Sequence, residues 1–113
     1  MAVRLKNAAA ALSNTNLTTI YTCPTNFNAR IREIIVANVD GSSAADITIK
    51  YTDTSASATF DLVSTKSVAA DDFLRLENAN IMLEAGDILK VQASAADDLT
   101  VSVFIEEQIT PAG

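Results

Sequence analysis

Three pairs of adjacent carboxylates are the side chains of this chain that could carry acid–base chemistry: Asp71-Asp72, Asp97-Asp98 and Glu106-Glu107. Glycoside hydrolysis needs two carboxylates that flank one bond. Neighbouring residues of a strand point to opposite faces, so Glu106 and Glu107 should diverge, and we expect both to be solvated surface charges. The aspartate pairs are typical of turns, in which the side chain bonds its own backbone. The sequence therefore predicts no catalytic pair.

The chain also does not contain the usual residue patterns of nucleophilic catalysis or of metal binding. The chain contains no histidine, which excludes a Ser-His-Asp or Cys-His arrangement. Cys23 is the single cysteine, so it forms no intrachain disulfide, and we expect it to be buried and structural. The turn at 38–41 lacks the spacing and the closing glutamate of an EF-hand, and the three glycines form no phosphate-binding loop. We predict a protein that is not an enzyme and has no cofactor or metal site.

Charge and hydropathy restrict the partners. The net charge is −6, with 14 acidic and 8 basic residues, and an acidic surface repels phosphate, so we expect no nucleic-acid partner. No apolar run approaches the ~20 residues that a membrane-spanning helix needs, so we expect no membrane partner. The apolar run at 8–12 is too short and too rich in alanine for a secretory signal, and we expect the chain to be made and used without export.

The elements that must position these residues are predicted to be short strands. A length of 113 residues suits one domain. Large apolar residues alternate with polar ones, or β-branched residues cluster, in runs bounded by Gly, Pro, Asn, Asp or Ser. These runs lie at 17–23, 29–39, 46–51, 60–63, 89–93 and 99–105, with Val68 in a further short strand. The pattern predicts an all-β fold, a single antiparallel β-sandwich or jelly roll.

Two segments leave alternatives open. Between Asp71 and Leu83 the apolar residues have near-helical spacing, and we prefer two extended pieces, 73–76 and 81–83, to a helix of one or two turns. The centre of the run at 29–39, residues 34–36, breaks strict alternation. That break fits either a strand buried on both faces or a β-bulge.

The ends of the chain differ from the body, and we divide the chain into an N-terminal arm or edge strand (1–14), the β-sandwich (15–107) and a C-terminal tail (108–113). Fourteen extended residues could reach roughly 45 Å, far enough to contact a neighbouring subunit. Phe104 falls on the strand face opposite the predicted core residues and is a second place where an apolar side chain could meet a partner. The candidate intersubunit contacts are Val3, Arg4, Leu5, Lys6 and Phe104.

Two stretches resemble a known group of proteins. The first is 20–24 followed by 29–41, a strand, a turn and a long apolar strand that ends in Asn38-Val39-Asp40-Gly41. The second is 81–93, which contains Leu83-Glu84-Ala85-Gly86-Asp87-Ile88-Leu89-Lys90-Val91. Together they resemble small virion structural proteins of tailed bacteriophages, over roughly residues 17 to 107.

The resemblance implies a capsid decoration (cement) protein that binds the assembled major capsid protein and stabilises the shell. It implies a homo-oligomer, with a trimer favoured, located in the virion that assembles in the host cytoplasm. A neck, tail or fibre-base protein is the alternative. A carbohydrate-binding module is a further one, because jelly rolls bind sugars through exposed aromatic side chains, and Tyr21 and Tyr51 are the candidates here.

Overall fold

A computed structural model describes residues 3–110, which form nine strands and no helix. None of these residues therefore belongs to a helix long and apolar enough to cross a membrane. The strands are β1 (Val3–Ala11), β2 (Thr18–Thr22), β3 (Phe27–Asn38), β4 (Ala45–Asp53), β5 (Ala58–Val68), β6 (Phe73–Leu76), β7 (Ile81–Leu83), β8 (Ile88–Ala93) and β9 (Leu99–Ile109).

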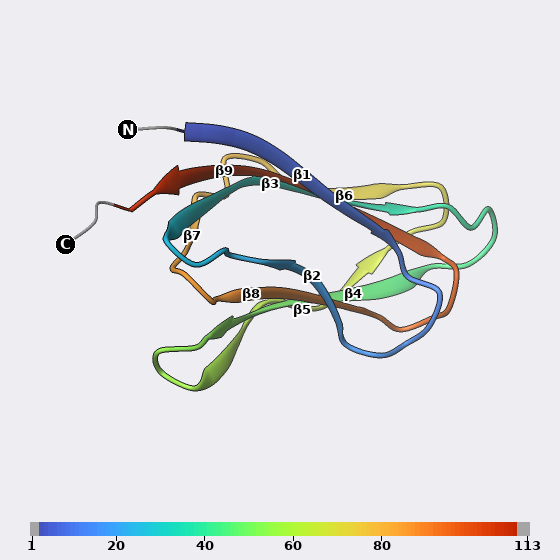
Figure 1. Cartoon of the computed structure of the whole chain (residues 1–113). Helices are drawn as coiled ribbons and strands as arrows, with labels where there is room; N and C mark the ends of the chain where they lie inside the picture. The colour runs from blue at the N-terminus through green and yellow to red at the C-terminus, as the bar shows by residue number, and fades with distance from the viewer. Residues whose placement is uncertain (1–2, 111–113) are drawn as a thin grey trace.

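The strands form two antiparallel sheets that pack face to face (Figure 1). The larger sheet has the order β1-β9-β3-β6, with β7 also paired to β3, and the smaller has the order β2-β8-β4-β5. The pairing is nested: β1 pairs with β9, β2 with β8, β3 with β6 and β7, and β4 with β5. This is the topology of a jelly roll, in which one strand position is here split between β6 and β7. The predicted all-β sandwich is confirmed.

The core lies between the sheets and follows the predicted alternation. On β9 the residues Leu99, Val101, Val103 and Ile105 are buried, whereas Phe104 points to the opposite face and is 40% exposed. Each large aliphatic side chain that is fully buried contributes about 1.5–3 kcal/mol. Both sheets supply such residues, and those buried on β3, β4 and β8 are Ala29, Ile31, Ile34, Val36, Ala45, Ile47, Ile49, Leu89, Val91 and Ala93.

The long strand β3 contains a bulge. Ile31 pairs with Ile105 and Glu33 pairs with Phe104, so Arg32 is an extra residue in the ladder. The bulge therefore lies just before the break in alternation at 34–36, where Ile34 and Val36 are fully buried and Ile35 is only partly buried. Strict alternation after the buried Ile31 would place Glu33 and Ile35 on the inner face, and because of the bulge they lie on the outer face of the sheet instead.

The structure settles one open alternative and changes two of the predicted strand ends. Residues 73–76 and 81–83 are extended, as preferred, and not helical. Val68 ends β5 and is not a separate strand, because β4 continues to pair with β5 as far as Val68. Strand β9 continues to Ile109, past the expected end of the sandwich at 107, because β3 pairs with it there.

The N-terminal segment forms an edge strand of its own domain. Strand β1 pairs with β9 from Val3 opposite Gln108 to Ala11 opposite Thr100, without any shift of register. Leu12, directly after it, is buried in the core and donates its N–H to the carbonyl of Leu99. Of the two alternatives for this segment, the structure therefore shows the edge strand.

Candidate functional site

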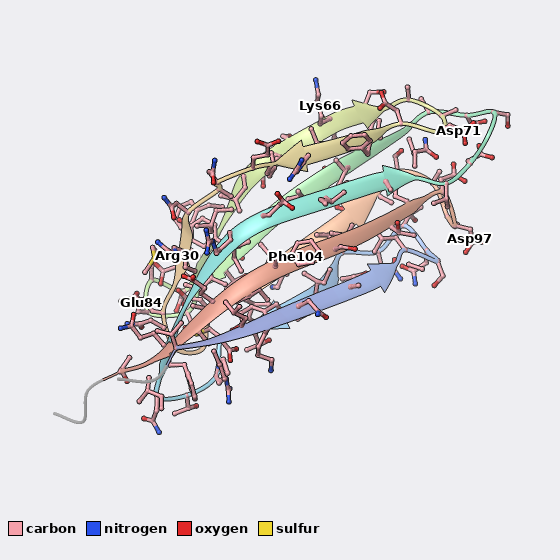
Figure 2. All side chains as sticks on the ribbon, turned by 90° about the horizontal axis from the view of Figure 1, so that it is seen from above. Arg30, Lys66, Asp71, Glu84, Asp97 and Phe104 are labelled. Carbon is pink, nitrogen blue, oxygen red and sulfur yellow. The ribbon has the colours of Figure 1, made fainter. Side chains whose placement is uncertain are left out.

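The outer face of the five-stranded sheet carries large apolar side chains that water can reach (Figure 2). Paired residues of neighbouring strands point to the same side, so one face can be followed across the sheet from the register. The exposed fractions run from 40% for Phe104 to 76% for Leu5. The exposed apolar residues of this face, called the outer patch below, are Val3 and Leu5 of β1, Phe73 of β6, Met82 of β7 and Phe104 of β9.

Ion pairs lie among these apolar side chains. Glu106 accepts hydrogen bonds from Arg30 and, at 2.9 Å, from Arg32. Arg75 pairs with Glu33 at 2.8 Å and with Glu77 at 3.2 Å. The hydrogen bond from Arg30, together with the charges of both arginines, holds the pKa of Glu106 below its ordinary value. Water screens pairs of this kind, so they shape the face more than they stabilise the fold.

Two shallow hollows flank the Arg30–Glu106–Arg32 cluster on this face. One, of about 410 Å³, is lined by Leu5, Phe104 and Arg32 among others. The other, of about 380 Å³, is lined by Val3, Met82 and other residues that include Arg30 and Glu106. The face therefore combines exposed apolar side chains and shallow hollows of mixed lining with fixed charges, a combination found on surfaces that bind another protein.

The five candidate contacts of the sequence analysis fall into two groups. Val3, Leu5 and Phe104 belong to the outer patch. Arg4 and Lys6 alternate with Val3 and Leu5 along β1 and lie on its opposite side. Arg4 is already engaged within its own chain, because its guanidinium bonds Glu107 and lies 4.2 Å from the centre of the Phe27 ring.

Glu107 is not the solvated surface charge that we expected. Its side chain is fully buried, because it continues the core face of β9 after Leu99, Val101, Val103 and Ile105. The predicted divergence from Glu106 is seen, since the two lie on opposite faces of the strand. The same alternation that predicted Phe104 on the outer face could have placed Glu107 inside, and a buried carboxylate always requires partners.

The partners of Glu107 come from both sheets. Tyr21 of β2 donates its hydroxyl to one carboxylate oxygen, and the Nε–H of Arg4 donates to the other. Burial raises the pKa of Glu107, but these two hydrogen bonds outweigh it and hold that pKa below its ordinary value. Burial, followed by the hydrogen bond to Glu107, raises the pKa of Tyr21. This buried cluster of Arg4, Tyr21 and Glu107 ties β1, β2 and β9 together at one end of the sandwich.

One acidic group was missed by the sequence analysis. Asp53, Glu84 and Asp87 bring carboxylate oxygens within 4.8 Å of one another. Asp87 is buried, and its oxygens accept the N–H groups of Thr54 at 3.1 Å and of Glu84 at 2.9 Å. These bonds fasten the turn at Gly86 to the loop after β4, so the arrangement has a structural explanation without a cation.

Cys23 is buried, as predicted. Its Sγ–H lies 3.4 Å from the carbonyl oxygen of Phe27, and burial raises the pKa of the thiol. A thiol in this state is a poor nucleophile, because the thiolate is the reactive form.

Neither a protein-family model nor a curated protein sequence matches the chain. Solved structures do match in fold. A chain from the capsid of the Helicobacter pylori bacteriophage KHP30 is similar with a TM-score of 0.56 and 8% identity, over 99% of this chain and 90% of that one. A chain of the disulfide-linked pili that form Bacillus endospore appendages has a TM-score of 0.54 and 13% identity, over 97% and 89%.

A capsid protein from metagenomic phage sequences, a pentamer, is 21% identical over 93% of this chain and 62% of that one, but its TM-score of 0.37 is too low to support an argument. At these identities the likenesses show a shared fold. The chain is therefore a single β-sandwich whose structural neighbours include a phage capsid chain and a pilus chain.

Proposed function

We propose that this protein is a non-enzymatic structural component of a bacteriophage particle, and that it is a capsid decoration protein. The observation that carries the proposal is the outer patch, a set of exposed apolar side chains that lies beside two shallow hollows and a cluster of ion pairs on one face. The fold shared with a capsid chain of the phage KHP30 supports the same class of role. Fold alone does not decide function, so the proposal depends on the face.

The mechanism would be linkage between binding and assembly. A protein that binds only the assembled shell of major capsid protein stabilises that shell by mass action, without any chemical step. The outer patch would supply apolar area, and its arginines and glutamates would set the orientation of the contact. The working unit would be a homo-oligomer located in the virion, and the resemblance to tailed-phage proteins implies three copies.

A neck, tail or fibre-base protein is the second candidate. The likeness to a pilus chain favours it, because the same fold there belongs to a polymer. A sugar-binding role has less support. Tyr21 is buried and bonded to Glu107, and Tyr51 packs against Phe60 at 5.5 Å between ring centres, so both tyrosines already have partners within the chain.

Localisation in purified particles tests the proposal. A decoration protein should cover the capsid in many copies, whereas a few copies confined to the tail would contradict decoration and support the second candidate. Phe104→Glu places a charge in the outer patch and should abolish binding to shells that lack the protein. Leu17→Glu is the matched control, because Leu17 is 42% exposed directly before β2 of the other sheet and should tolerate the same change.

A further inference from the structure

The edges of the two sheets differ in how open they are. Natural proteins protect edge strands with bulges, short length or charged side chains. Strand β2 has five residues and a register shift between Thr19 and Tyr21. Strand β5 carries two shifts in its pairing with β4. The remaining edge of the larger sheet is divided into β6 and β7, of four and three residues.

Strand β1 has neither a bulge nor a short length, and its charged side chains, Arg4 and Lys6, are confined to one half of it. All nine of its residues pair with β9 in one continuous register, and within residues 3–110 no strand pairs with its other side. Figure 2 shows β1 as the border of the larger sheet, beside its antiparallel neighbour β9. A straight edge of this kind presents regularly spaced N–H and C=O groups to a further strand.

The order of residues in β1 favours a second copy of β1 as that strand. The first four positions, Val3-Arg4-Leu5-Lys6, have large side chains, and the last four, Ala8-Ala9-Ala10-Ala11, have small ones, with Asn7 between them. In an antiparallel pair centred on Asn7, every large side chain lies opposite an alanine of the other copy. The nine residues then pair without a clash and without a gap at either end.

Other two-fold registers fit less well. In a two-fold pair, residues that face each other must point to the same side of the sheet. The axis therefore has to pass between the two copies of one residue, and not between two successive positions of the strand. A pair centred on Leu5 places Arg4 opposite Lys6, and a pair centred on Lys6 places two lysines opposite each other, which like charges disfavour. A pair centred on Ala8 leaves Val3 and Arg4 without partners.

We propose that β1 docks antiparallel against β1 of a second copy about Asn7, which joins two five-stranded sheets into one continuous sheet. The two outer patches then lie on the same side of the joined sheet, because the two-fold axis is perpendicular to it. The inference holds whether or not the protein decorates a capsid. It predicts an even number of copies in solution, whereas the resemblance implies three.

Disulfide trapping tests the register. Residues directly opposite in an antiparallel pair have Cα atoms about 4.5–5.5 Å apart, within the range that a disulfide spans. Asn7→Cys should therefore form a covalent dimer on mild oxidation. Leu5→Cys should not link to its own symmetry mate, which would lie ~13 Å away along the strand, but a mixture of Leu5→Cys and Ala9→Cys proteins should form the mixed dimer.

Two controls accompany the cysteine variants: a test of folding and a measure of cross-linking by random collision. Asn7, Leu5 and Ala9 are exposed, so circular dichroism and Tm should show that each variant is folded. Val39→Cys reports random collision between exposed thiols, while the native Cys23 is buried. Cross-linking of Asn7→Cys at the level of Val39→Cys overturns the proposal, and so does cross-linking of Leu5→Cys alone that equals or exceeds that of Asn7→Cys.

Discussion

Glu106 and Glu107 are consecutive residues of β9 in opposite environments. Glu106 lies on the outer face, where two arginines and water surround it, and Glu107 lies inside, where Tyr21 and Arg4 are its hydrogen-bond donors. One residue type therefore lies on the proposed partner surface on one side of the strand and holds the fold together on the other. The comparison teaches that alternation, and not residue type, decides what a charge in this sandwich does.

The largest expected difference between the two is in stability. Glu107→Ala leaves the hydroxyl of Tyr21 without its acceptor inside the sandwich and releases Arg4, which should cost about 3 kcal/mol. For a domain of this size the loss should lower Tm by more than about 10 °C. Glu106→Ala removes pairs with two partly exposed arginines and should lower Tm by much less. Thermal unfolding measures both, and equal shifts would show that Glu107 has no special structural role.

The alternation that governs this pair also decides how much of the molecule could be predicted. The core face of β9 and the exposure of Phe104 follow from local pattern alone, and they are confirmed. The extended segments 73–76 and 81–83 are also confirmed, although their apolar residues have near-helical spacing. The hydrogen-bond partners of Glu107 do not follow from local pattern, because Arg4 and Tyr21 lie 103 and 86 residues away in the sequence.

The N-terminal strand shows the same limit. The alternation of Val3-Arg4-Leu5-Lys6 predicts an extended segment, but whether that segment pairs within its chain depends on the free side of β9, which local sequence does not describe. The bulge at Arg32 is similar, because it exists only relative to the register of β9. The pairing of strands that are far apart in the sequence therefore could not be predicted from the local pattern.

Glu106 and Glu107 should also contribute differently to the pH dependence of the free energy of unfolding. A carboxyl whose pKa is lowered by folding stabilises the protein above its unfolded pKa, about 4.3, and that contribution is lost as the pH falls through the lower, folded pKa. Both carboxyls have a lowered pKa, so wild-type stability should fall in acid. Urea unfolding across this range should show a shallower fall for Glu107→Gln.

Repeating the urea unfolding at high salt distinguishes the contributions of the two glutamates. The ion pairs of Glu106 join it to two partly exposed arginines and should weaken as salt screens them, whereas the bonds of the fully buried Glu107 should persist. The acid-dependent loss of stability should therefore remain in Glu106→Gln at high salt and shrink in Glu107→Gln. A pH dependence that salt removes entirely would assign the effect to the outer face and contradict this interpretation.

The smallest expected effect concerns the arginines on the two sides. Arg4 donates from Nε to Glu107 while its guanidinium covers the Phe27 ring, and lysine keeps the charge but loses this planar geometry. Because Arg4 is partly exposed, Arg4→Lys should cost only about 0.5–1 kcal/mol. Arg30→Lys, on the outer face, should cause no measurable change in urea unfolding, because Arg32 also pairs with Glu106. A larger loss for Arg30→Lys than for Arg4→Lys would contradict the distinction between the outer face and an interior that holds the sheets together.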